Sequence, residues 1–170
     1  MLLGYAYHAF SFSLLKYAIP LFLVAIPYLM QGKIKLTFCT RDILIGITVS
    51  AVVLSPMWYF MSRRGGIFVF LPATKVLFQI FGVAFPEEIY FRGFLQDRFG
   101  NHIKAMIVVS LLFSLAHLPQ LIFYGDPYSL LTFFPSLVMG FLYMRTANVL
   151  PCTIFHALAN IIFLGFYDIL

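Results

Sequence analysis

Charged residues are scarce in this sequence, and their scarcity argues against a water-soluble domain. Only 10% of the 170 residues are Asp, Glu, Lys or Arg, whereas 62% are hydrophobic, and the mean hydropathy is +0.98. A soluble domain of this composition would expose large apolar patches and aggregate. Apolar stretches of roughly 20 residues, enough to cross a hydrocarbon core of about 30 Å, recur along the chain. We therefore expect an integral membrane protein.

Cysteine motifs, repeats and a cleavable leader are also lacking. The two cysteines, Cys39 and Cys152, have neither CxxC nor metal-ligand spacing, so we assign them no role, and a disulfide between them remains open. The N-terminus has no basic region and no small-residue cleavage site, so we interpret it as a retained first span. We find no internal repeat and no low-complexity segment.

Hydropathy and helix breakers predict an all-α, polytopic bundle of six transmembrane helices. The third span is long and contains Pro86, which lacks the backbone N–H that would bond to Gly82. We expect a kink just before Glu87, or two shorter helices in its place. The six expected spans lie near Phe10–Met30, Ile43–Met61, Leu71–Phe99, Ile103–Tyr124, Tyr128–Met144 and Val149–Tyr167.

The net charge of +5 comes from basic residues at the edges of apolar stretches, which favours membrane topology over binding to nucleic acid. With six spans, one side of the membrane collects more of these residues and is expected to be cytoplasmic, with both termini outside. The richer side holds Lys33, Lys35, Arg41, Arg98, Lys104 and Arg145, and the other holds Arg63, Arg64 and Lys16.

Three ionisable residues, Glu87, Glu88 and Arg92, lie deep within the third span, where each costs free energy unless it faces a partner or a cavity. Glu88 and Arg92 are four residues apart, the favoured spacing for an intrahelical ion pair. Glu87 points about 100° away from Glu88 around the helix and has no partner of its own in this segment. Glu87 is therefore the candidate proton acceptor.

Two later spans carry the other polar signals: His117 in one, and His156 with Asn160 in the other. Asn160 follows His156 by one turn, so both share a face. At about 1.5 Å per residue, Glu87 lies about 16 Å from Arg98, His117 about 20 Å from Lys104, and the other pair about 12 to 18 Å from Asn148. This agreement in depth predicts one shared site.

A carboxylate, two histidines and an asparagine around a wet pocket suit peptide hydrolysis by an activated water. Glu87, helped by His117, would take the proton from water, and His156 with Asn160 would bind the oxyanion. Ser110 or Ser114 as a nucleophile is a weaker alternative, since neither lies in a GxSxG context.

Three motifs in this constellation resemble those of the CPBP family, the CAAX-protease and bacteriocin-processing intramembrane proteases also called the Abi family. Glu87–Gly93 matches EExxxR, Phe113–His117 matches FxxxH, and His156–Asn160 matches HxxxN, in the family's order. The stretch Gly140–Asn148 is also similar to the family, and the resemblance covers about residues 70 to 165.

The resemblance implies a glutamic-type intramembrane endopeptidase with no cofactor. Glu87 and His117 would activate water, His156 and Asn160 would form the oxyanion hole, and Glu88, Arg92 and Phe113 would support them. It also implies a division into N-terminal transmembrane helices, 1–66, and a protease core, 67–170. The short chain is similar to prokaryotic members in the cytoplasmic membrane. Such members cut a membrane-embedded or membrane-delivered peptide, such as a leader, a C-terminal sorting tail or a CaaX-like segment.

Two other functions remain open from the sequence. Glu87, His117 and His156 are also a possible ligand set for a catalytic zinc, with Asn160 behind them, although no HExxH is present. A non-enzymatic immunity or scaffold protein, or a proton-coupled carrier, would use the buried acids without cleaving anything. A stoichiometric zinc supports the first of these, and function that survives Glu87→Gln supports the second.

Overall fold

The computed structural model of the chain describes residues 15–31 and 34–167, and within these ranges all regular structure is helical. The elements are α2 (Leu15–Gln31), α3 (Thr40–Arg63), α4 (Ala73–Leu77), η1 (Phe78–Ala84), α5 (Phe85–Glu88), η2 (Ile89–Gln96), α6 (Ile103–Leu115), α7 (Leu118–Tyr124), η3 (Pro127–Thr132), α8 (Phe133–Thr146) and α9 (Val149–Tyr167).

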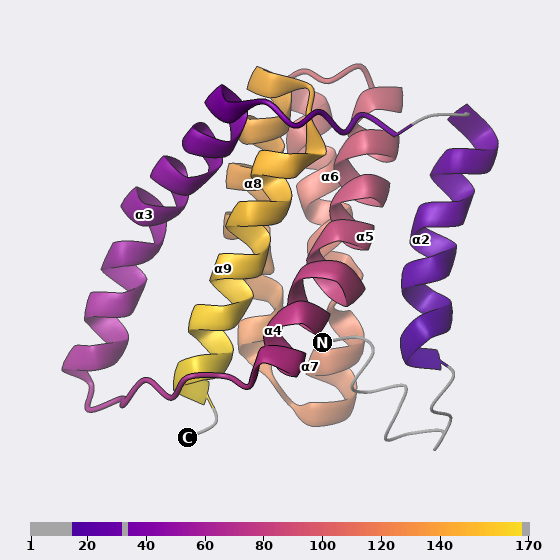
Figure 1. Ribbon diagram of the computed structural model, residues 1–170. Coiled ribbons are helices and arrows are strands. Elements are labelled where there is room, and N and C mark those ends of the chain that lie inside the picture. Colours follow the sequence, from indigo (N-terminus) through magenta and orange to yellow (C-terminus); the bar gives the residue numbers. More distant parts are fainter. Residues whose placement is uncertain (1–14, 32–33, 168–170) are drawn as a thin grey trace.

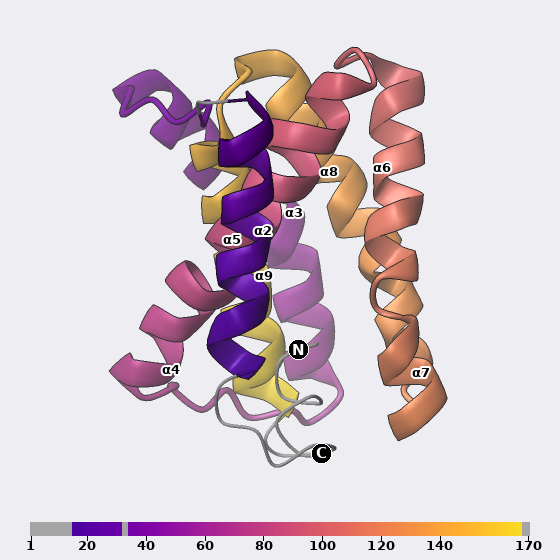
Figure 2. The same cartoon turned by 90° about the vertical axis from the view of Figure 1, so that its right-hand side faces the viewer.

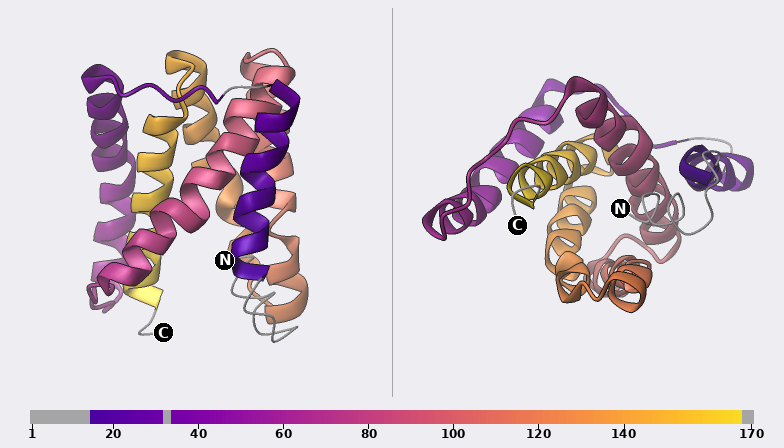
Figure 3. Two further views of the ribbon diagram at one scale, coloured as in Figure 1. Left: turned by 45° about the vertical axis from the view of Figure 1, so that its right-hand side comes forward. Right: turned by 90° about the horizontal axis from the view of Figure 1, so that it is seen from below.

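These elements form six spans that run up and down between the two ends of a bundle (Figure 1). Seen from below, α2 and α3 lie at opposite sides, with the remaining helices between them (Figure 3). α3 packs along α9, and α2 packs against α5 and η2. The predicted polytopic all-α bundle is confirmed, and the N-terminal part of the first expected span, 10–14, lies outside the described residues.

Four helical segments of the described chain are long and apolar enough to cross a membrane: Thr40–Arg63, Ile103–Tyr124, Pro127–Thr146 and Val149–Phe166. α2 contributes a shorter apolar stretch, Tyr17–Met30. The span from Ala73 to Gln96 has comparable length but carries the three buried charges, Glu87, Glu88 and Arg92. The bundle therefore has one span that composition alone would not assign to lipid.

That charged span is one unbroken helical path through α4, η1, α5 and η2, and not two helices. η1 and η2 have the wide turns of a π-helix, and Pro86 lies in the short α5 between them. The N–H of Phe85 bonds to Ile80 O, five residues back. Because Pro86 has no N–H and its ring crowds the preceding turn, a wide turn before it keeps the path continuous.

The span Ile103–Tyr124, in contrast, is interrupted where α6 ends and α7 begins (Figure 2). The N–H of His117 bonds to Ser114 O, three residues back, in a tight turn. Pro119 lies in the first turn of α7, where a proline fits because no N–H is needed. The turn places His117 between two helices, whereas the sequence predicted a continuous helix there.

The interior of the bundle combines aromatic packing with buried polar groups, and large apolar side chains cover the outside. The core cluster includes Ile89, Phe113, Tyr143 and Phe155. Exposed Leu, Ile, Val and Phe side chains cover α2, α3 and α6. This distribution suits a protein whose solvent is lipid, where polar groups gather inside.

Asn148 fixes the start of α9 to the end of the bundle where α2 and α3 are joined. Its Nδ2 donates to Thr37 O at 2.8 Å and to Asp42 Oδ2 at 2.9 Å, and its Oδ1 accepts from Thr37 N at 3.2 Å. Lys35 Nζ and Asp97 Oδ2, 2.6 Å apart, form an ion pair at the same end. These contacts set the height of α9 relative to the charged span.

The basic residues divide between the two ends of the bundle as the alternating spans predicted. The connections α2–α3, η2–α6 and α8–α9 share one end (Figure 1). Lys35, Arg41, Arg98, Lys104 and Arg145 belong to this end, and Arg63 and Arg64 to the other. Lys33 and the side chain of Lys16 lie outside the described residues. The cytoplasmic side of the membrane remains a prediction from this asymmetry.

Gly46 allows α3 to approach α9 closely, and its replacement by leucine is expected to destabilise the bundle. A Cβ at Gly46 would lie 2.9 Å from Pro151 Cα. Because Pro151 Cα is a backbone atom and cannot rotate out of the way, the helices must move apart, at a cost of about 1–3 kcal/mol. Thermal unfolding in detergent measures the effect, with Val52→Leu on the exposed face of α3 as the control. Equal melting temperatures for the two variants would contradict this packing.

Candidate functional site

Glu88 is fully buried and is held from two sides. Its Oε2 lies 3.1 Å from Arg92 Nε, and its Oε1 accepts from His156 Nδ1 at 2.9 Å. Arg92 is also fully buried, and its Nη2 donates to Ser136 Oγ at 2.8 Å. The predicted ion pair between Glu88 and Arg92 is therefore present, and it extends to His156 on α9.

Glu87 lies beside this cluster but is not hydrogen-bonded to it. Its Oε2 is 3.9 Å from His156 Nε2, too far for a hydrogen bond, and has no hydrogen-bond partner. Glu87 is 8% exposed, whereas Glu88 and Arg92 are 0% exposed. The two glutamates thus differ in the way the sequence suggested: one is paired, and the other keeps free lone pairs.

His117 is oriented by its own helix end. Its ring Nδ1 donates to Phe113 O at 2.8 Å, a contact that requires the four-residue spacing of the FxxxH motif. Because a carbonyl oxygen only accepts, Nδ1 carries the hydrogen and Nε2 of the neutral ring is an acceptor. His117 also interacts electrostatically with Glu87 and His156. The contact with Phe113 O therefore fixes the ring and leaves Nε2 as the nitrogen that is not engaged by the backbone.

Phe113 packs against both histidines. Its ring centroid is 4.8 Å from that of His117 and 5.7 Å from that of His156, and Arg92 Cζ lies 5.4 Å away. Phe91 meets it edge-on at 5.0 Å. This buried ring contacts groups from three spans, so it fixes their spacing.

Asn160 follows His156 by one turn, and its hydrogen bond goes to a residue that the sequence reading did not consider. Asn160 Nδ2 donates to Gln79 Oε1 at 3.1 Å. Gln79 belongs to η1, on the same helical path as the glutamates. The structure thus brings Glu87, Glu88, Arg92, Phe113, His117 and His156 together, and Asn160, one turn along α9 from His156, is hydrogen-bonded to Gln79.

Gln120 is a second residue that the sequence reading missed. It lies three residues after His117, is 4% exposed, and neither polar atom of its amide has a hydrogen-bond partner. In the sequence, Gln79 and Gln120 could have been singled out because each is a glutamine inside an apolar span, at helical spacing from a motif residue.

The two serines considered as alternative nucleophiles, Ser110 and Ser114, have different surroundings. Ser114 Oγ donates to Leu130 O at 2.9 Å, which engages its hydroxyl away from His117. Ser110 is fully buried and its hydroxyl has no partner. Cys39 and Cys152 are both free, so the open question of a disulfide is answered. Among the described residues, no three His, Cys, Asp or Glu side chains are grouped as metal ligands.

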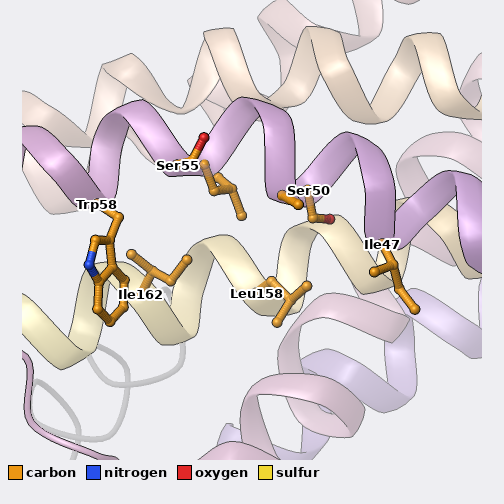
Figure 4. A pocket seen from close by; sticks show the side chains of 8 residues that line it. Ile47, Ser50, Ser55, Trp58, Leu158 and Ile162 are labelled. Atoms are coloured by element: carbon orange, nitrogen blue, oxygen red, sulfur yellow. The ribbon is translucent and has the colours of Figure 1, made fainter.

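A groove of about 290 Å³ between α3 and α9 is separate from this cluster (Figure 4). Its α9 side is formed by Leu158 and Ile162, two residues beyond His156 and Asn160 and so about 200° around the helix. Ser50 and Ser55 line it, but both hydroxyls donate to backbone carbonyls of α3. The groove is apolar and opens away from the buried acids.

Comparison with known proteins identifies the family. The model of the type II CAAX prenyl endopeptidase Rce1-like family matches residues 68–162. The chain belongs to the Rce1-like family. The Rce1-like match begins after α3, ends within α9, and contains every polar residue of the cluster described above. No curated protein and no solved structure matches the chain.

Family and fold together establish the general class of the protein. Rce1-like proteins are CAAX-type proteases, and the described part of this chain has four helices long and apolar enough to cross a membrane. It is an integral membrane peptidase, and its substrate is a peptide.

Proposed function

We propose that the chain is a glutamic-type intramembrane endopeptidase in which Glu87 activates the attacking water. The observation that carries the proposal is the unequal state of the paired glutamates. Glu88 is ion-paired with Arg92 at 3.1 Å and hydrogen-bonded to His156, whereas Glu87 Oε2 has no hydrogen bond and lies 3.9 Å from His156 Nε2. A carboxylate with free lone pairs inside a nearly dry site has the placement of a general base.

The reaction follows from these positions. Glu87, assisted by the free Nε2 of His117, takes a proton from water, and the hydroxide adds to the scissile carbonyl carbon. His156 and the Asn160 amide donate hydrogen bonds to the oxyanion. The proton held by Glu87 then passes to the leaving amine as the C–N bond breaks. Glu88 and Arg92 hold His156 in place throughout.

The substrate is a peptide segment that enters from the membrane or is delivered at its surface. The family's description names prenylated CAAX tails, and leaders and C-terminal sorting tails pose the same physical problem. In each case an extended peptide must reach a buried carboxylate within a bundle of apolar helices.

The test compares one synthetic peptide in two forms, prenylated and unprenylated on the cysteine of a CAAX tail, with purified protein in liposomes. Mass spectrometry is expected to show a single new cleavage between internal residues. Cleavage of the prenylated form alone assigns a prenyl substrate, and equal cleavage of both assigns a peptide-only one. If neither form is cut, cells carrying only Glu87→Gln should accumulate the uncut natural precursor, and normal maturation of every precursor would overturn the proposal.

The metal content of the purified protein distinguishes the glutamic mechanism from a metal-dependent one. We expect the chelator-treated protein to retain its cleavage rate, because Glu87 and His117 supply the base directly. A stoichiometric zinc whose removal abolishes cleavage, and whose return restores it, would replace the glutamic mechanism with a metal-dependent one.

A further inference from the structure

The contact between Gln79 and Asn160 connects a residue outside the three motifs to the last motif. Asn160 Nδ2 donates to Gln79 Oε1 at 3.1 Å. Both side chains are half-buried, and they come from helices that also meet through Glu88 and His156. α9 is therefore bound to the glutamate helix twice, once at each of its two polar site residues.

We propose that Gln79 is a positioning residue that sets the orientation of the Asn160 amide. A primary amide presents an oxygen on one side and an NH₂ group on the other. When Gln79 Oε1 accepts one N–H of Asn160, the second N–H of the same nitrogen is left for another acceptor. Rotating the amide by half a turn would place its oxygen against Gln79 Oε1, so this contact holds the Asn160 amide in one orientation.

This inference rests on the proposed function, in which Asn160 stabilises the oxyanion. There the consequence is direct, because an amide oxygen facing the oxyanion would repel it and an N–H would bind it. Gln79 would act on Asn160 as Glu88 acts on His156, whose Nδ1 it engages. η1, which carries Gln79, has the wide π-type turns that recur at functional sites.

The experiment uses Gln79→Met, which keeps the length of the side chain and removes the acceptor, and Gln79→Glu, which keeps an acceptor oxygen. Losing one oxyanion donor costs about 100- to 1,000-fold in kcat, and a donor that is present but no longer oriented should cost less. We expect Gln79→Met to lower kcat by about tenfold with little change in KM, and Gln79→Glu to retain most of the rate. A purely structural role would not produce this division between kcat and KM, nor the recovery by glutamate.

A double-mutant cycle with Asn160→Ala isolates the pair. In the Asn160→Ala background, Gln79→Met is expected to cause no further loss of kcat, since the amide it orients is gone. The same fractional loss in both backgrounds would overturn the inference, as would a Gln79→Glu variant as slow as Gln79→Met. If Gln79→Met does not fold, Gln79→Leu replaces it in the same cycle.

The Glu87→Gln variant distinguishes a failure of the proposed role of Gln79 from a failure of the glutamic mechanism. If Glu87→Gln is inactive and Gln79→Met cleaves at the wild-type rate, the role of Gln79 fails and the glutamic mechanism stands. If Glu87→Gln cleaves at the wild-type rate, the mechanism fails and the inference fails with it.

Discussion

Replacing Glu87 by glutamine is expected to reduce cleavage by at least about 100-fold, because an amide of the same shape cannot take a proton from water. The variant should remain as stable as the wild type. Glu87 Oε2 makes no hydrogen bond and lies 3.9 Å from His156 Nε2. Cleavage of a membrane peptide by purified protein in liposomes, followed by mass spectrometry, measures the rate.

The control for Glu87→Gln is binding of the same peptide. A photo-crosslinkable substrate should label the variant and the wild type equally, since the substitution leaves the fold intact. Loss of crosslinking together with cleavage would mean that Glu87 binds the substrate and does not activate water. Cleavage at the wild-type rate would remove Glu87 from the mechanism.

Replacing Arg92 by methionine is expected to have the largest effect on stability. Arg92 and Glu88 are both fully buried and lie 3.1 Å apart, and Arg92 also donates to Ser136 Oγ. Removing the guanidinium leaves a buried carboxylate without its cation, and breaking a buried pair in this way costs about 3–5 kcal/mol. Thermal unfolding in detergent, with activity measured in parallel, gives the effect.

Arg98→Met is the matched control for Arg92→Met, because Arg98 is exposed and stacks on Phe94 at 4.9 Å near the end of the same helix. The control should melt near the wild-type temperature. The double variant Glu88→Gln with Arg92→Met should recover part of the lost stability, since it removes both buried charges. Equal melting temperatures for Arg92→Met and Arg98→Met would show that the ion pair of Glu88 and Arg92 contributes nothing to the stability of the fold.

The six spans could be predicted from the sequence because lipid demands long apolar helices and leaves few alternatives. The site could be predicted for the complementary reason. Glu87, Glu88 and Arg92 are too costly in an apolar span to be incidental, and the histidines fall at the same depth. The structure places these groups together, and their catalytic roles remain predictions that the experiments above test.

The local backbone could not be predicted, because it depends on how neighbouring turns accommodate proline. Pro86 is flanked by wide turns within an unbroken path, and Pro119 follows a tight turn that isolates His117. Gln79 stands out in the sequence as a polar residue within an apolar span, but its contact with Asn160 becomes apparent only once the two helices are packed together. Hydropathy is assigned to each residue separately, whereas each of these features depends on how residues contact one another in the folded chain.

The most direct test of the account is to measure kcat and melting temperature for Glu87→Gln and Glu88→Gln side by side in one preparation. The account predicts unequal variants: Glu87→Gln loses turnover and keeps its melting temperature, and Glu88→Gln melts earlier and retains part of its turnover. The reason is that Glu88 forms an ion pair with Arg92 and a hydrogen bond with His156, whereas Glu87 Oε2 has no hydrogen bond and lies 3.9 Å from His156 Nε2. Equal losses of turnover with unchanged melting temperatures would contradict the separate roles of the two glutamates.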